Sequence, residues 1–428
     1  MSGNYYESTI GFRPPTRPLA GRNETDVCII GAGFAGLATA LGLIERGRSN
    51  LVVLEAERVG HGASGRNGGF VFGGYSLDNA ELLSQLGPER ARAAYGLTRE
   101  ALGTIRRRIG QHGIACDKVE GGALLVNWFD EPAILERQQR LMRDAFGVEW
   151  GLIDKRELDA CHVRSDRYFG ALLEPDAFHF HPLKYTLGLA AAIGAGGGRV
   201  HEHSPVRSIR RRGAVWRVRT AHGEVHAREL VIAGGGYLRH LVPALERAML
   251  PIATYVMVTE PLGALGKALI PSPAAIYDTR FAFDYYRMLP DTRLLWGGRI
   301  NVRDRRPEDI ADFLKRDLLR VYPRLADVKV DFAWSGLMSY ARHKMPQIGR
   351  LASGPCAGAW HAISFGGHGV APTTVAGELL AAAIASAQPI PEAFGRYGLP
   401  RTWGPLGLAA AQATYSWLEA KDWMRSRG

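Results

Sequence analysis

The stretch Asp26-Val-Cys-Ile-Ile-Gly-Ala-Gly-Phe-Ala-Gly36 decides the fold of this 428-residue chain. It opens with an apolar run typical of a strand and passes through three glycines into apolar residues at helical spacing. A second apolar run, Leu51–Leu54, follows and ends at Glu55. The order strand, glycine turn, helix, strand, acid predicts an α/β fold with a Rossmann-like nucleotide-binding unit.

Each glycine of this motif has its own physical role. Gly31 permits the tight turn, Gly33 lets a pyrophosphate approach the backbone, and Gly36 lets helix and strand pack closely. The helix N-terminus then offers the phosphates free N–H groups and the positive end of its dipole. Glu55, 19 residues after Gly36, can accept both ribose hydroxyls and would repel a 2′-phosphate. NAD and FAD both remain compatible with this pattern.

A second glycine-rich stretch, Gly60–Tyr75 (GHGASGRNGGFVFGGY), favours FAD over NAD. It holds seven glycines in sixteen positions, which is costly unless the backbone must turn sharply or touch a partner. Besides backbone N–H groups it offers side-chain donors from Ser64, Arg66 and Asn67. These donors can meet the flavin part of a long ligand, whose flat ring tolerates backbone but no bulk.

Two further glycine sites lie far downstream. Val231–Gly236 follows a predicted strand, and Phe365–Val370 opens an apolar helix predicted over Thr374–Ala385. The helix N-terminus at the second site can stabilise negative charge on a reduced flavin. Four glycine sites spread along the chain therefore indicate an extended cofactor.

Four segments of the chain resemble the FAD-dependent amine oxidoreductases of the D-amino-acid-oxidase (DAO) family, and most strongly the γ-glutamylputrescine oxidase group. They keep their order and span nearly the whole chain: GASGRNGG (Gly62–Gly69), SDRYFGALLEPDAFHFHPLKY (Ser165–Tyr185), FDYYRMLPDTRLLWGG (Phe283–Gly298) and GHGV (Gly367–Val370). The resemblance implies a discontinuous Rossmann-like FAD domain and a substrate domain with a large, mainly antiparallel sheet and flanking helices.

The implied domains interleave along the chain. Alternating apolar residues at Tyr255–Val258 and Leu294–Trp296 favour the antiparallel sheet, and helical patterns occupy Glu131–Phe146, Pro307–Tyr322 and Leu408–Arg425. The expected segments are an N-terminal arm (1–24), the FAD domain (25–78, 155–237 and 331–390), the substrate domain (79–154 and 238–330) and a C-terminal extension with a helix (391–428).

The resemblance also implies which residues hold FAD. Val206 would contact adenine through its backbone, and no covalent bond to the flavin is expected, because Trp334–Gly349 lacks the cysteine that covalent relatives carry there. The complete expected set is Gly31, Gly33, Phe34, Ala35, Gly36, Glu55, Ala56, Gly62, Ala63, Ser64, Arg66, Asn67, Gly68, Gly69, Val206, Ala233, Gly234, Gly367, His368, Gly369 and Val370.

The expected chemistry is oxidation of an amine C–N bond by hydride transfer to FAD. Catalytic candidates are Tyr286, His368, Trp334 and His343, and substrate candidates are Tyr285, Tyr286, Arg287 and Arg299. For the aromatic residues core packing is the alternative, and for the arginines an ion pair is.

Met338 bears on the class of substrate. Relatives that act on free α-amino acids resemble G-x-R-P at the segment that begins with Gly336, where this chain has Met338 instead of the arginine. Without that bidentate clamp for a carboxylate, a polyamine-like, γ-glutamylated or secondary amine is favoured. The imine would hydrolyse to an aldehyde, and O2 would reoxidise the flavin to give H2O2. Because Arg293–Arg299 holds no lysine of the kind that oxygen-using relatives place beside the flavin, a dehydrogenase with another electron acceptor stays open.

Composition limits the other function classes. The formal net charge of +11 is compatible with a tRNA-modifying FAD protein, but the basic residues form no long stripe, and the runs at 106–108 and 210–212 are expected to be solvated. Four cysteines without a C-x-x-C pair favour a reducing cytoplasm and no metal site. No secretory signal and no membrane span is visible.

Overall fold

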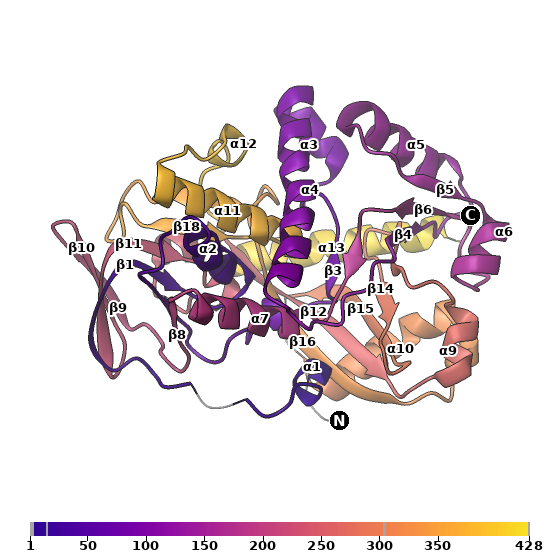
Figure 1. Ribbon diagram of the computed structural model, residues 1–428. Helices are drawn as coiled ribbons and strands as arrows, with labels where there is room; N and C mark the ends of the chain where they lie inside the picture. The colour runs from indigo at the N-terminus through magenta and orange to yellow at the C-terminus, as the bar shows by residue number, and fades with distance from the viewer. Residues whose placement is uncertain (1–3, 14–15, 303–304, 427–428) are drawn as a thin grey trace.

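Two eight-stranded sheets organise the chain, and Figure 1 shows them side by side with helices packed around them. The computed structural model describes residues 4–13, 16–302 and 305–426. The first sheet contains the strands of the nucleotide-binding motif, and the second contains the expected antiparallel strands. The predicted architecture is therefore confirmed.

The first sheet is built around the parallel strands of the opening motif. Strand β1 (Gly21–Ile30) pairs in parallel with β2 (Leu51–Leu54) on one side and with β11 (Gly223–Ile232) on the other. The order is β17-β18-β11-β1-β2-β8, and β9 and β10 extend it from β11. The remaining bounds are β8 (Arg199–His201), β9 (Ser208–Arg212), β10 (Val215–Arg219), β17 (Gln347–Arg350) and β18 (Trp360–Ile363).

A layer of helices packs on this sheet. Helix α2 (Phe34–Ile44) begins after the glycine turn and packs closely on α11 (Val370–Ser386), because a Cβ at Gly377 would lie only 2.5 Å from the Ala38 Cβ. Helices α4 (Pro88–Gln111) and α7 (Pro182–Ala195) complete the layer.

One residue of the basic run 106–108 departs from the expected solvated face. Arg108 is fully buried between the helices of this layer, where its guanidinium pairs with Glu45 and Glu378. The charges are compensated inside the helix layer, so burial of this arginine does not leave an isolated cation.

The second sheet has the order β16-β12-β15-β14-β13-β4-β6-β5, and β13 with β4 is its only parallel pair among the described strands. Helices α9 (Gly263–Leu269) and α10 (Pro307–Val321) lie beside it at the lower right of Figure 1. Its strands are β4 (Ala123–Val126), β5 (Gly151–Ile153), β6 (Ala171–Glu174), β12 (Leu250–Thr259), β13 (Ala275–Asp278), β14 (Tyr285–Met288), β15 (Leu294–Asn301) and β16 (Val330–Tyr340).

Two strands of the second sheet fall inside segments expected in the FAD domain. Strand β6 lies within 155–237 but pairs with β4 and β5, and β16 lies within 331–390 but pairs with β12 along its length. The sheet to which a strand belongs is decided by the strands with which it pairs. The partners of β6 and β16 are distant along the chain, so the local sequence does not indicate the sheet.

The remaining elements are mostly short connections. The arm before residue 25 contains helix α1 (Tyr5–Ser8), and the C-terminal extension contains the predicted helix as α13 (Pro405–Arg425). No helix in the described part of the chain is long and apolar enough to cross a membrane. The others are β3 (Phe70–Val71), β7 (Phe178–His179), α3 (Asn79–Leu86), α5 (Ala133–Leu141) continued by a π-helical turn (Met142–Phe146), α6 (Lys155–Glu157) continued likewise (Leu158–His162), α8 (Pro243–Glu246), α12 (Glu392–Gly395) and 3-10 turns at Ala63–Gly65, Gly235–Tyr237 and Pro323–Leu325.

Candidate active site

The glycine turn after β1 leaves the N-terminus of α2 open to a ligand. Gly31 has φ +105°, and a Cβ on it would lie 2.7 Å from the Ala233 carbonyl oxygen, so the turn and the segment Ala233–Gly234 touch through backbone. A Cβ on Gly36 would overlap the Gly31 carbonyl. A residue with a side chain would clash at either position, and the N-terminus of α2 lies directly after this turn, where its dipole favours an anion.

Ser64 joins the second glycine stretch to this helix. Its Oγ accepts a hydrogen bond of 2.8 Å from the Phe34 N–H, and a Cβ on Gly33 would lie 2.9 Å from that Oγ. The serine therefore caps α2, and among the described residues no acceptor takes its hydroxyl proton, which can be donated.

Glu55 lies at the end of β2 with both carboxylate oxygens in contact with backbone. Its Oε2 accepts from the Ala32 N–H at 2.8 Å and its Oε1 from the Glu57 N–H at 3.1 Å. Burial raises the pKa of Glu55, while these N–H groups oppose that rise. Each oxygen keeps a lone pair for a ribose hydroxyl, and the Ser204 N–H binds the Glu55 carbonyl, which brings the segment leading to Val206 alongside.

Arg66 and Asn67 donate to backbone carbonyls of their own loop, and the Arg66 Nη1 also donates to the Ser335 carbonyl of β16 at 3.3 Å. The Arg66 Nε donates to the His61 carbonyl at 2.8 Å. The Asn67 Nδ2 donates to the Ala63 carbonyl at 3.0 Å, and its Oδ1 accepts from the Gly69 N–H at 2.8 Å. These contacts hold the loop backbone rigid, so the side chains shape the site indirectly.

The same loop is fastened to the second sheet. The indole Nε1 of Trp334 donates to the Arg66 carbonyl at 2.9 Å. A Cβ on Gly68 would lie 2.6 Å from the Tyr285 ring, and one on Gly69, at φ +80°, would overlap the Phe180 carbonyl oxygen. Trp334 and Tyr285, both sequence candidates, are thus in the site.

Arg287 is in the site, and its guanidinium binds backbone carbonyls of the neighbouring segments. It is 2% exposed, its Nε donates to the Gly68 carbonyl at 2.7 Å, and its Nη2 donates to the Phe180 carbonyl at 2.9 Å. Its Nη1 lies 3.3 Å from the His179 Nδ1. Among the described residues no carboxylate pairs with it. Arg287 therefore positions the loop, which corrects its expected role as a substrate clamp.

The GHGV segment forms the far end of the site. Gly369 precedes α11, and the His368 Nε2 donates to the Phe72 carbonyl at 3.3 Å. Burial lowers the pKa of His368 to about 4, so the imidazole is neutral at physiological pH. A Cβ on Gly367 would lie 3.4 Å from the Met338 Sδ and 2.9 Å from the Tyr340 hydroxyl, which places Met338 beside this segment.

Tyr286 does not belong to the site. Its ring stacks on Trp296 with 4.4 Å between centroids, and its hydroxyl lies 3.1 Å from that of Tyr322 under helix α10. Successive residues of a strand point to opposite faces, so Tyr285 on the loop side forces Tyr286 into the core.

Two further sequence candidates also lie elsewhere. His343 stacks on Tyr397 with 4.6 Å between centroids, beyond the end of β16, and burial lowers its pKa to about 4. Arg299 forms a bidentate pair with Asp317 at 2.7 Å and also contacts Glu419 of α13. Neither side chain is available to a ligand at the glycine loop.

The structure adds residues that sequence reasoning missed. Phe72 packs on the His368 ring (4.1 Å) and on Tyr277 (5.5 Å), which faces the loop side of the second sheet two residues from Ala275. Glu174 faces the same side through its pairing with Ala123; it is 4% exposed, its Oε1 accepts from the Gly73 N–H, and its Oε2 has no partner. Burial raises the pKa of Glu174 to about 7. Period-two alternation within β6 could have indicated this face.

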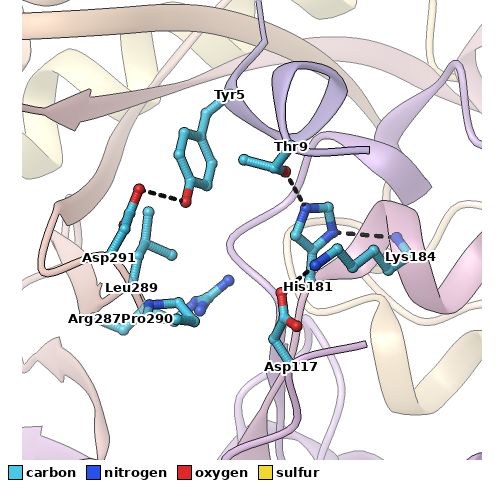
Figure 2. A pocket seen from close by; sticks show the side chains of 9 residues that line it. All are labelled: Tyr5, Thr9, Asp117, His181, Lys184, Arg287, Leu289, Pro290 and Asp291. Atoms are coloured by element: carbon cyan, nitrogen blue, oxygen red, sulfur yellow. Dashed lines mark hydrogen bonds and ion pairs between the residues drawn. The ribbon is translucent and has the colours of Figure 1, made fainter. Parts of the chain in front are cut away.

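A pocket of about 260 Å³ has Arg287 among the residues that line it (Figure 2). Its polar side chains pair with one another: Lys184 with Asp117 at 2.7 Å, and the Tyr5 hydroxyl with Asp291 at 3.0 Å. The described residues contain no cluster of three or more metal-ligating side chains.

Comparison with known proteins agrees with this geometry. Residues 26–383 match the family model described as DAO, FAD dependent oxidoreductase. The chain is 37% identical to the gamma-glutamylputrescine oxidoreductase of Escherichia coli strain K12 over 382 residues, which covers 89% of this chain and 88% of that protein. It is 33% identical to a probable oxidoreductase of Haemophilus influenzae, covering 86% and 84%.

A solved structure supports the fold. Glycine oxidase from Geobacillus kaustophilus superposes with a TM-score of 0.74 at 20% identity, covering 89% of this chain and all of the other.

Proposed function

This chain belongs to the DAO family of FAD-dependent oxidoreductases, and on that premise we propose that it oxidises a C–N bond of an amine. The candidate substrates are polyamine-like, γ-glutamylated or secondary amines. The similarity to a gamma-glutamylputrescine oxidoreductase supports this class. FAD is the cofactor that the family shares, and this chain is an enzyme.

The residues of the site fit FAD. The turn Gly31–Gly36 and the N-terminus of α2 suit its pyrophosphate, and Glu55 suits the ribose. Gly68 lets the loop backbone pack directly against Tyr285, and Gly369 opens α11 at the other end, where a helix N-terminus suits the flavin. We propose a non-covalent FAD, because Trp334–Gly349 contains no cysteine.

When bound at this site, FAD would supply the redox chemistry as the acceptor of a hydride from the carbon beside the amine nitrogen, and hydrolysis of the resulting imine would give an aldehyde. The chain must hold the amine unprotonated with that carbon against the ring. His368 binds the Phe72 carbonyl as a neutral imidazole, so it can orient the amine, but with a pKa of about 4 it is too weak a base to take the proton of an ammonium group.

One observation carries the preference for an amine over a free α-amino acid. At the position where amino-acid-oxidising relatives have an arginine, this chain places Met338, with its sulfur beside Gly367. Arg287 and Arg299 are both engaged elsewhere. Tyr285 and Tyr277, the other residues that we place around the substrate, offer aromatic faces. Such faces attract an alkylammonium group by about 0.5–2 kcal/mol.

The proposal is tested by product analysis. Purified holoenzyme is incubated with γ-glutamylated diamines, free diamines, N-methyl amines and α-amino acids, and aldehyde formation is quantified by derivatisation. We expect aldehyde from at least one amine class at a rate at least tenfold above that from any α-amino acid. Faster turnover of an α-amino acid would refute the amine assignment.

The electron acceptor separates an oxidase from a dehydrogenase. The strand β15 and the preceding Arg293 hold no lysine that could sit beside a flavin. If O2 is the acceptor, one H2O2 forms per aldehyde under air. Turnover that needs an added quinone or dye and yields no peroxide identifies the dehydrogenase.

A further inference from the structure

The C-terminal helix α13 carries apolar side chains on the face that it turns away from the protein. Its inner face is anchored, because the Tyr415 hydroxyl accepts from the Ile300 N–H at 3.1 Å and Asp422 accepts from the Phe281 N–H at 2.7 Å. The opposite face, here called the outer seam, is exposed along the whole helix and consists of Leu406, Ala410, Ala413, Trp417, Ala420 and Met424.

The spacing of the outer seam is that of a paired helix. Its residues follow one another at intervals of four, three, four, three and four, which is the a/d pattern of a heptad repeat. Leu406 is 76% exposed, Trp417 64% and Met424 52%, so large apolar surfaces meet water in an isolated chain. A contiguous patch of this kind marks an interaction surface.

The outer seam is complementary to itself when two copies run antiparallel. About a two-fold axis at the level of Tyr415, Leu406 faces Met424, Ala410 faces Ala420, and Ala413 faces Trp417. Each pair joins an a to a d position, as antiparallel packing of two heptad seams requires, and the largest side chain meets one of the smallest.

The residues that flank the outer seam agree with the same register. On each flank of an antiparallel pair equal heptad positions meet, so Trp423, which is 50% exposed, lies nearest Ala409 of the second copy and Lys421 lies nearest Gly407, and no like charges meet. A parallel pair would instead set Trp417 against its own copy and leave the alanine layers poorly filled.

We propose that α13 forms the interface of a homodimer, with the outer seams of two copies packed antiparallel. This inference is independent of the reaction assigned above. The exposed side chains of the outer seam and Trp423 offer about 500 Å² per copy, and the sum of about 1,000 Å² is the minimum expected of a biological interface, which predicts a dimer that dissociates on dilution.

A membrane surface suits this helix less well than a second copy. Helices that lie on a bilayer present a broad apolar face bordered by several Lys and Arg residues. Three of the six outer-seam residues are alanine, and the described part of α13 carries only Lys421 and Arg425, the latter paired with Glu131.

The oligomeric state of the holoenzyme tests the proposal. Light scattering during gel filtration at 1–50 µM should give the mass of two chains for the native protein at the upper end of this range. Ala413→Glu and Trp417→Glu should each halve that mass while the flavin absorbance and the melting temperature stay unchanged. Ala93→Glu, at an exposed alanine of helix α4 outside the outer seam, is the matched control and should remain dimeric.

Cysteine cross-linking tests the register. In a Cys161→Ser background, which removes the one exposed thiol, Ala410→Cys with Ala420→Cys should give a covalent dimer on mild oxidation. Ala410→Cys alone should not, because its two copies lie about 15 Å apart along the helices.

A monomeric native protein at 50 µM, or a dimer that survives Ala413→Glu, overturns the proposal. The proposal is also overturned if the native protein is a monomer that floats with phosphatidylglycerol vesicles and Trp417→Glu abolishes this flotation. That result would show that the outer seam binds a membrane.

Discussion

The Arg287 guanidinium donates to the Gly68 carbonyl at 2.7 Å and joins strand β14 to the glycine loop across 219 residues of sequence. The same guanidinium binds the Phe180 carbonyl. A fully buried arginine without a carboxylate partner among the described residues is thus satisfied by backbone carbonyls. The second sheet thereby fixes the loop that we propose borders the flavin.

Removing this guanidinium should weaken FAD binding. Arg287→Met leaves two buried carbonyls without a donor, each at a cost of about 1–3 kcal/mol. We expect the Kd for FAD, measured by fluorescence quenching on titrating the apoprotein, to rise at least tenfold. The Kd for FAD of Arg287→Lys should lie between those of the native protein and Arg287→Met. Arg293→Met, which removes a more exposed arginine of the same sheet, is the control; an equal loss there would show a general effect on folding.

Gly36 should tolerate no side chain. A Cβ there would overlap the Gly31 carbonyl, so Gly36→Ala forces the helix away from the turn and should destabilise the fold by about 1–3 kcal/mol or more. Gly103→Ala has no atom within 4 Å of the new Cβ and sits inside α4, so it should stabilise by about 0.5–1 kcal/mol. Urea unfolding measures the change in the free energy of unfolding for both variants. A Gly36→Ala protein that is stable and still binds FAD would contradict the predicted overlap.

The opening motif and the four glycine sites could be predicted from sequence because each is a local pattern. The different placement of Tyr285 and Tyr286 could not be predicted. The alternation of side chains along a strand shows that the two rings point to opposite faces of the sheet, but it does not show which face lies against the glycine loop. The partners of Arg287 lie more than a hundred residues away, and no local pattern marks them. Glu174 was missed because a strand carboxylate is ordinarily exposed, whereas here Gly73 and the second sheet bury it.

Glu174 should make stability depend on pH. Burial raises its pKa to about 7, above the value of an unfolded glutamate, so its contribution is present below about pH 4.5 and is lost as the pH rises through 7. Glu174→Gln does not ionise and should gain stability relative to the native chain between pH 5 and pH 8.5, by at most about 3 kcal/mol. Thermal unfolding of the native and Glu174→Gln proteins at both pH values tests this prediction. If the difference in stability between the two proteins is the same at both pH values, a buried titrating carboxyl is contradicted.

Met338 should control the choice between amines and amino acids. Met338→Arg places a guanidinium beside Gly367, where it can bind a carboxylate in bidentate fashion. We expect kcat/KM for a short α-amino acid to rise at least tenfold and that for the amine substrate to fall. Met338→Leu adds no charge and should leave the preference unchanged; the same shift in both variants would point to pocket shape instead.

The most direct test of the account is anaerobic mixing of the holoenzyme with candidate substrates while flavin absorbance near 450 nm is followed. We predict that a γ-glutamylated, polyamine-like or secondary amine bleaches the flavin fully within seconds, whereas free α-amino acids at the same concentration leave it oxidised. Rapid bleaching by an α-amino acid, with every amine inert, would contradict the assignment.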